Sequence, residues 1–223
     1  MYFSKVQLPT GADYFFFLKE SNYSNLYHAH QLLWKMFPNN PVAQRDFLFR
    51  EQQVNNQIYY YLVSERKPES VFGLEIQTKD YFPKISKGDL YRFSLRANPV
   101  ITRKSLGKKN SVQHDVLMDA KKEAREKDFS KEVEYNHIRN KTINWLQKKA
   151  EANGFSIIPE NVSFDQYRQH TLYKKNKQQI KFSTVDYYGI LEVDDTEMFK
   201  KSLFYGIGKK KAFGCGLLLI KPI

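Results

Sequence analysis

The spacing of apolar residues predicts one helix and four strands before residue 80. Residues 2–8 mix apolar and polar side chains as a short strand does. From 25 to 37, apolar residues recur every three or four positions, which indicates an amphipathic helix. The runs at 46–50, 57–64 and 71–77 are rich in aromatic and β-branched residues and predict three more strands. The helical stripe consists of Leu26, Ala29, Leu33, Met36 and Phe37.

A similar order follows a linker at 80–88. Residues 103–131 interrupt it and read as a charged, turn-rich insertion. Between the last strands, residues 169–179 form the tip of a long basic hairpin. The predicted elements are a strand at 90–97, a helix at 132–153, strands at 155–168 and 181–193, a helix from 194 to 205 and a last strand at 217–220.

The strand–helix–strand–strand–helix–strand order therefore occurs twice, with the second helix missing or shortened in the first copy. This order is that of the split βαβ plan. We expect an α+β protein of two tandem ferredoxin-like βαββαβ domains, at 1–85 and 89–223. RNA-recognition domains use the same plan, although a fold alone does not give a function.

Charge separates the two predicted domains. The whole chain has a formal net charge of +12, of which residues 1–88 carry +2 and residues 89–223 carry +10. A basic domain indicates an anionic partner such as nucleic acid. No apolar run reaches the roughly 20 residues of a membrane span, so no membrane partner is expected. A single cysteine, Cys215, excludes internal disulfides and favours a reducing, cytoplasmic setting.

A glycine-rich basic stretch lies near the C-terminus, at residues 206–216. Glycine permits positive φ angles, and successive backbone N–H groups in such a loop can face an anion. The stretch lacks the Gly-Lys-Ser/Thr ending of a nucleotide-binding P-loop. A turn with solvated lysines is the alternative interpretation. The residues of interest are Gly206, Gly208, Lys209, Lys210, Lys211, Gly214 and Gly216.

Other basic residues could line a groove beside this loop. Arg92 and Arg96 alternate onto one face of their predicted strand. Aromatic residues among such cations offer stacking surfaces for bases. Ordinary surface charge is the alternative. The basic hairpin contributes Lys174, Lys175, Lys177 and Lys181.

The first predicted helix carries the catalytic candidates. Tyr27 and His30 stand three residues apart and share a helical face, whereas His28 points elsewhere. An imidazole beside a phenol can move protons at a phosphate. Two partly buried polar residues on an amphipathic helix are the alternative. The histidine spacing does not suit a metal, and no cofactor motif is present.

Several segments occur in an order that resembles the CasE family, the endoribonucleases that process CRISPR repeats in the type I-E Cascade complex. The likeness spans nearly the whole chain, and residues 103–131 depart from it by being longer and more charged. The matching segments are 27–34 (YHAHQLLW), 37–39 (FPN), 45–50 (RDFLFR), 93–99 (FSLRANP), 145–149 (WLQKK) and 206–218 (GIGKKKAFGCGLL).

The resemblance implies binding of the repeat stem-loop and one metal-independent cut at the base of the stem. The 2′-hydroxyl would attack the adjacent phosphate, leaving a 2′,3′-cyclic phosphate and a 5′-hydroxyl. His30 would relay the proton, Tyr27 would position the hydroxyl, and Lys211 would offset charge on the phosphorane. The product would stay bound among the other Cascade subunits. A non-catalytic RNA-binding subunit and a ribonucleoprotein assembly protein remain the alternatives.

Overall fold

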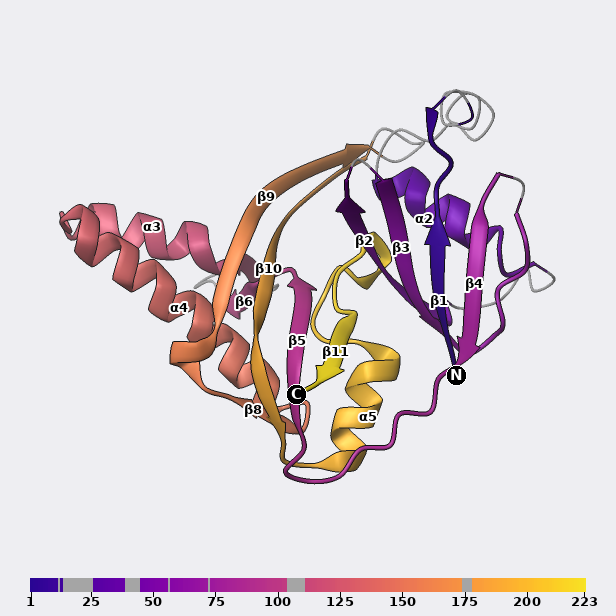
Figure 1. Cartoon of the computed structure of the whole chain (residues 1–223). Coiled ribbons are helices and arrows are strands. Elements are labelled where there is room, and N and C mark those ends of the chain that lie inside the picture. The colour runs from indigo at the N-terminus through magenta and orange to yellow at the C-terminus, as the bar shows by residue number, and fades with distance from the viewer. Residues whose placement is uncertain are drawn as a thin grey trace.

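The structure, a computed structural model, describes most of the chain as two antiparallel sheets with helices beside them (Figure 1). The described residues are 1–11, 13, 26–38, 45–55, 57–71, 73–103, 111–173 and 178–223, with only the backbone described for 26–28.

The first sheet has four strands in the order β2-β3-β1-β4, and every neighbouring pair is antiparallel. This is the strand order of a ferredoxin-like domain. No helix occurs between β3 and β4 in the part of that connection that the structure describes. The elements are β1 (Tyr2–Gln7), α2 (Leu26–Trp34), β2 (Phe47–Val54), β3 (Gln57–Ser64) and β4 (Glu75–Asp80).

The second sheet repeats this order as β11-β5-β10-β8. The strand predicted at 155–168 is divided into β8 and β9 by a short 3₁₀ turn, η1 (Pro159–Asn161), and both parts pair with the long β10. The expectation of two ferredoxin-like units is therefore confirmed. The elements are β5 (Leu90–Ala97), α4 (Lys131–Glu151), β8 (Phe155–Ile157), β9 (Ser163–Tyr173), β10 (Gln179–Val193), α5 (Thr196–Tyr205), η2 (Lys211–Phe213) and β11 (Leu218–Pro222).

The first sheet uses residues 2–80 and the second uses 90–222, so residues 81–89 connect them. The domain bounds 1–85 and 89–223 stay a prediction that agrees with this connection.

The interpretation of 103–131 as a turn-rich insertion is wrong for much of its length. Strand β7 (Val112–Asp115) pairs with β6 (Val100–Arg103), and helix α3 (Val116–Glu126) follows directly. Asp115 caps α3 by accepting a hydrogen bond from the backbone N–H of Met118 at 2.9 Å. Helix α3 runs beside α4, and the pair projects away from the first sheet (Figure 1).

The predicted tip at 169–179 is also too long. Strand β9 continues to Tyr173 and β10 begins at Gln179, since cross-strand pairing extends to the pair Tyr173–Gln179. Lys174, Lys175 and Lys177 lie outside the described residues.

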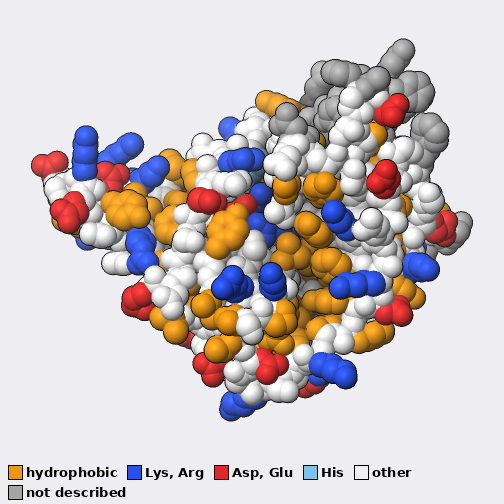
Figure 2. Space-filling view, in the orientation of Figure 1, with side chains coloured by type: hydrophobic (Ala, Val, Ile, Leu, Met, Phe, Trp, Pro, Cys, Tyr) orange, Lys and Arg blue, Asp and Glu red, His pale blue; other side chains and the backbone are white. Residues whose placement is uncertain are grey.

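Strand β2 joins the two domains because its alternate side chains enter different layers. Phe47 and Phe49 pack in the core of the first domain, together with the predicted apolar stripe of α2. Leu48, on the opposite face, packs with Val63 and Leu217 between the domains. A cleft of about 490 Å³ opens beside this contact. Figure 2 shows apolar side chains gathered between the sheets with Lys and Arg beside them.

Among the described residues, no helix is both long and apolar enough to cross a membrane.

Candidate functional site

His30 lies half-buried among aromatic rings. Its ring centroid is 6.0 Å from that of Phe47 and 6.3 Å from that of Phe49, and the latter pair is stacked. Its Nε2 atom accepts a hydrogen bond from Trp34 Nε1 at 3.0 Å. Nδ1 is buried and has no hydrogen-bond partner among the described residues. Burial, and to a smaller extent the nearby Arg45 guanidinium, lower the pKa of His30 to about 4, so the ring is neutral at pH 7.

The charge of Arg45 acts on His30 and on a second cation, Lys211. Arg45 precedes β2, and Lys211 begins η2, the 3₁₀ turn that contacts α2 and β2. Burial lowers the pKa of both, and repulsion from Arg45 adds to the effect on Lys211. Lys211 Nζ donates a hydrogen bond to the carbonyl oxygen of Tyr205 at 2.6 Å. Within the described part of the chain, no carboxylate forms an ion pair with either cation. This cluster is therefore suited to an anion.

Arg45 thus links two of the three predicted catalytic residues, because its charge acts on both His30 and Lys211, and η2, which begins at Lys211, packs on α2 and β2. The backbone of Tyr27 lies on α2, three residues before His30, and its side chain is outside the description. Sequence reasoning missed Arg45. The one available signal was the likeness of segment 45–50 to the CasE family.

The glycine loop ends α5 and leads to β11, as predicted, and all four of its glycines have positive φ. The N–H groups of Gly206 and Gly216 donate to Ser202 O and Arg96 O, both within about 2.9 Å. A Cβ on Gly216 would lie 2.7 Å from the carbonyl oxygen of Ile207. The expectation that successive N–H groups of the loop face an anion is therefore wrong for these two glycines, because their N–H groups hold the loop to the protein.

The three loop lysines have different surroundings. Lys209 is exposed. Lys210 has the left-handed backbone angles φ 59° and ψ 29°, and its ammonium lies 5.5 Å from the ring centroid of Phe182 on β10. Lys211 instead reaches the end of α5 through its bond to Tyr205. The side chain of Lys210 thus lies at β10, whereas the side chain of Lys211 lies at the end of α5.

Arg96 has a structural partner. Its guanidinium donates two hydrogen bonds to the buried carboxylate of Asp186, at 2.7 and 2.8 Å. Arg50 of β2 contacts the same carboxylate at 3.5 Å and donates to Ser94 Oγ. The contacts of Arg50, and a bond from Arg96 to the backbone oxygen of Glu51 at 3.3 Å, tie the two domains together. An RNA contact by Arg96 stays a prediction. Arg92, on the same strand face, is exposed.

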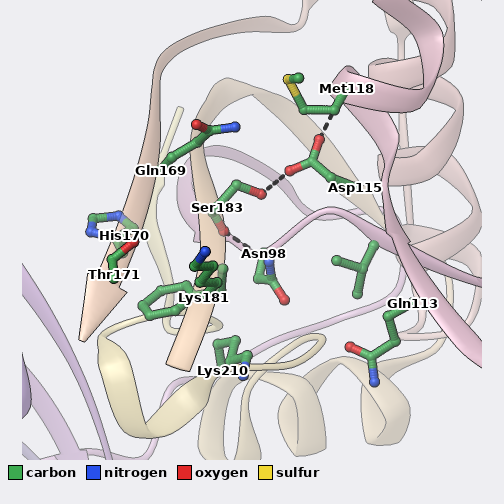
Figure 3. Close-up of a pocket in the computed structure, with 12 residues that line it drawn as sticks. Asn98, Gln113, Asp115, Met118, Gln169, His170, Thr171, Lys181, Ser183 and Lys210 are labelled. Carbon is green, nitrogen blue, oxygen red and sulfur yellow. Dashed lines mark hydrogen bonds between the residues drawn. The ribbon is translucent and has the colours of Figure 1, made fainter. Parts of the chain in front are cut away.

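Lys181 is exposed on β10 and lines a cavity of about 400 Å³. The β6–β7 hairpin, β9, β10 and Lys210 of the glycine loop surround this cavity (Figure 3). Lys181 and Lys210 are thus two predicted RNA-binding residues that the structure brings together. Neither Arg92 nor Arg96 belongs to the cavity.

No cluster of three or more His, Cys, Asp or Glu side chains that could hold a metal ion occurs in the described ranges.

Comparisons with known proteins agree with this architecture. The family described as CRISPR associated protein matches residues 1–222. The chain is 31% identical to the Cascade subunit CasE of Escherichia coli K12 over 203 residues, which cover 89% of this chain and 93% of that protein. It is 27% identical to the CRISPR-associated endoribonuclease Cse3 of Thermus thermophilus over 153 residues, which cover 65% and 61% of the two chains.

A solved structure of CRISPR endoribonuclease Cse3 bound to a 19-nucleotide RNA superposes on the whole chain with a TM-score of 0.72, at 21% identity and with both chains fully covered. This likeness supports the two-domain fold. The match over residues 1–222 and the identity to CasE confirm the resemblance seen in the sequence, and the chain belongs to the family of CRISPR-associated proteins that includes CasE.

Proposed function

We propose that this protein is an endoribonuclease that binds the stem-loop of the CRISPR repeat and cuts precursor RNA once, at the base of the stem. The endoribonuclease name of its Thermus relative and the Cascade membership of its Escherichia relative support this assignment. The proposed products carry 2′,3′-cyclic phosphate and 5′-hydroxyl ends. The protein then keeps the stem-loop as a subunit of a Cascade complex in the cytoplasm.

The observation that carries the proposal is that the charge of Arg45 acts on both His30 and Lys211, where η2 packs on α2 and β2. Two partly buried cations without a carboxylate partner in the described residues favour a bound anion, because an anion offsets both their burial and their mutual repulsion. A phosphodiester of the RNA provides that charge. A neutral imidazole next to this phosphate can accept a proton at pH 7.

Cleavage then proceeds by transfer within the RNA. The 2′-oxygen forms a bond to phosphorus as His30 takes its proton. The bond from phosphorus to the 5′-oxygen then breaks as His30 passes this proton to that oxygen. Arg45 and Lys211 stabilise the extra negative charge on the phosphorane. Electrostatic stabilisation of this kind makes the largest contribution to rate enhancement in many enzymes. Tyr27 positions the 2′-hydroxyl. No metal is needed in this scheme, because His30 transfers the proton and the two cations stabilise the developing charge.

His30 must change its contacts for this reaction, since Trp34 occupies Nε2 and Nδ1 is buried. The phosphate of the bound RNA would favour this change of contacts. Its negative charge raises the pKa of His30 from about 4 and favours a ring that faces the phosphate. Substrate binding would thus convert the site to its reactive form.

Single-turnover cleavage of the cognate repeat hairpin in EDTA tests the proposal. The replacement His30→Ala should nearly abolish cleavage, by about 10²–10⁴-fold, while the dissociation constant stays close to wild type. Tyr27→Phe should slow the reaction less, and His28→Ala should leave it nearly unchanged. Wild-type cleavage by His30→Ala, or loss of cleavage in EDTA, contradicts the proposed chemistry.

A non-catalytic RNA-binding subunit is the second candidate, favoured by the position of His30 in an aromatic cluster. It predicts binding of the repeat hairpin without cleavage by the wild-type protein. In either case affinity should fall steeply with salt. Joint replacement of Lys174, Lys175, Lys177 and Lys181 by Ala should lower the log–log salt slope by about 0.7–0.9 for each phosphate that the variant no longer neutralises.

A further inference from the structure

The cavity between the two hairpins of the second domain has the properties of a ligand site. Its volume of about 400 Å³ lies in the range of roughly 300–1,000 Å³ that is typical of small-molecule pockets. Val100 and Met118 give it apolar walls, and amide, carboxylate and ammonium groups give it polar ones. A site with this mixture can hold a molecule with a flat, partly apolar body and several polar edges.

Asn98 supplies a hydrogen-bond acceptor in this cavity. Its side-chain amide N–H donates to the backbone oxygen of Ser183 at 2.8 Å, which fixes the orientation of the amide. The residue is only 2% exposed, and no donor among the described residues reaches its Oδ1. Figure 3 shows this oxygen directed into the cavity. A buried carbonyl without a partner is unfavourable, so a ligand that donates an N–H there is favoured.

The cavity is electrostatically polarised. At its inner side, the carboxylate of Asp115 accepts hydrogen bonds from the backbone N–H of Met118 and from Ser183 Oγ (Figure 3). At its other side lie the ammonium groups of Lys181 and Lys210. A ligand that fits has N–H donors at one end and an anion at the other. A single nucleotide meets this requirement, because its base presents N–H groups and its phosphate is negative.

We propose that this cavity holds one unpaired nucleotide of the RNA, with the base edge donating to Asn98 and the phosphate next to Lys181 and Lys210. The inference rests on the proposed function, since it presumes that the protein binds repeat RNA. It adds a subsite that reads one nucleotide outside the duplex stem. Such a site gives base discrimination that contacts to a double-helical backbone do not give.

Two substitutions fill the cavity from opposite walls. Gln113→Trp enters from β7 and Thr171→Trp from β9, and both positions are exposed, so both variants should fold. Val112→Trp is the matched control, because its side chain lies on the other face of β7 and outside the cavity lining. All proteins, the reference included, carry His30→Ala to keep the RNA intact during binding.

The probe is a series of cognate repeat hairpins in which each unpaired nucleotide in turn is replaced by an abasic residue. For the reference protein, one abasic position should weaken binding by about tenfold, the effect of removing one well-held base. Both filling variants should bind the unmodified hairpin about tenfold more weakly and show no further loss at that abasic position. The Val112→Trp control should behave like the reference.

The proposal is overturned if no abasic position couples to the filling variants, that is, if the two losses simply multiply. If the wild-type protein binds and cuts the hairpin while coupling is absent, only the nucleotide subsite is wrong. If no protein of the series binds the hairpin, the proposed function is wrong and the subsite fails with it.

Discussion

Trp34 donates its indole N–H to Nε2 of His30 across 3.0 Å, from one turn further along the same helix. A hydrogen bond of this direction requires the lone pair of a neutral imidazole, so it stabilises the unprotonated ring. Burial, which is the largest cause, and the charge of Arg45 act in the same sense and lower the pKa of His30 to about 4. The tryptophan thus helps to keep the imidazole neutral in the free protein, until RNA binding changes the contacts of the ring.

Replacing Trp34 by Phe should raise the pKa of His30, because the neutral ring loses its hydrogen-bond donor while the aromatic surroundings remain. If the neutral ring is the base, kcat/KM rises with pH through the His30 pKa of the free protein and then levels off. The acidic limb of the profile should therefore move upward in the variant. Titration of the His30 ring by NMR should show the same displacement. An unchanged limb together with an unchanged NMR titration would exclude this role for Trp34.

The same histidine makes stability depend on pH. In the unfolded chain its pKa is near 6.5, and in the folded protein it is about 4. Between these values the unfolded state binds the proton and the folded state does not, so lowering the pH favours unfolding. The wild-type Tm should therefore fall as pH drops from 6.5 towards 4.

A His30→Phe variant isolates this contribution, since phenylalanine keeps an aromatic ring beside Phe47 and Phe49 but cannot titrate. Its Tm should fall less than that of the wild type over the same interval. Parallel curves for the two proteins would show that the pKa of His30 is not depressed in the folded state.

The strands and α2 could be predicted because their sequences carry strong periodicity. Ala29, Leu33 and Met36 of the predicted helical stripe all lie in the first core. Helix α3 was missed because two of its four buried residues are alanines, Ala120 and Ala124, set among many charges. Small apolar residues give little periodic signal, whereas packing against α4 buries them as effectively as larger ones.

The site could be predicted only in part. His30 was accessible because its spacing from Tyr27 is a local property of one helix. Arg45 could not be predicted in this way, because its electrostatic effect on Lys211 joins positions far apart in sequence through the packing of η2 on α2 and β2. The pattern of Arg92 and Arg96 showed their shared face but could not show that buried Asp186 pairs with Arg96.

Asp186 should be more important for stability than any exposed carboxylate. It is 2% exposed and faces two guanidinium groups, those of Arg50 and Arg96. The Asp186→Asn variant leaves both cations without their countercharge, and we expect a loss of about 3–5 kcal/mol in the free energy of unfolding. Urea denaturation measures this loss. The exposed Asp194→Asn control on the neighbouring segment should change stability by less than about 0.5 kcal/mol.

Arg45 provides the sharpest test of the anion site, because it was identified from the structure and its charge acts on both other members. Arg45→Gln keeps a polar side chain but removes the positive charge, so the phosphorane loses one source of stabilisation. We expect the single-turnover rate on the repeat hairpin to fall by about 10²-fold. The pKa values of Lys211 and His30 should both rise, since Arg45 lowers each of them.

Arg103→Gln is the matched control for Arg45→Gln, because it removes an arginine charge from β6, where Arg103 pairs with Asp119 on α3, away from the cluster. It should leave the cleavage rate close to wild type. If both variants cleave equally slowly, the loss of any positive charge slows the reaction, and the position of Arg45 beside His30 is not important. A normal rate for Arg45→Gln would remove the cation pair from the mechanism and leave proton transfer by His30 as the only contribution of this cluster.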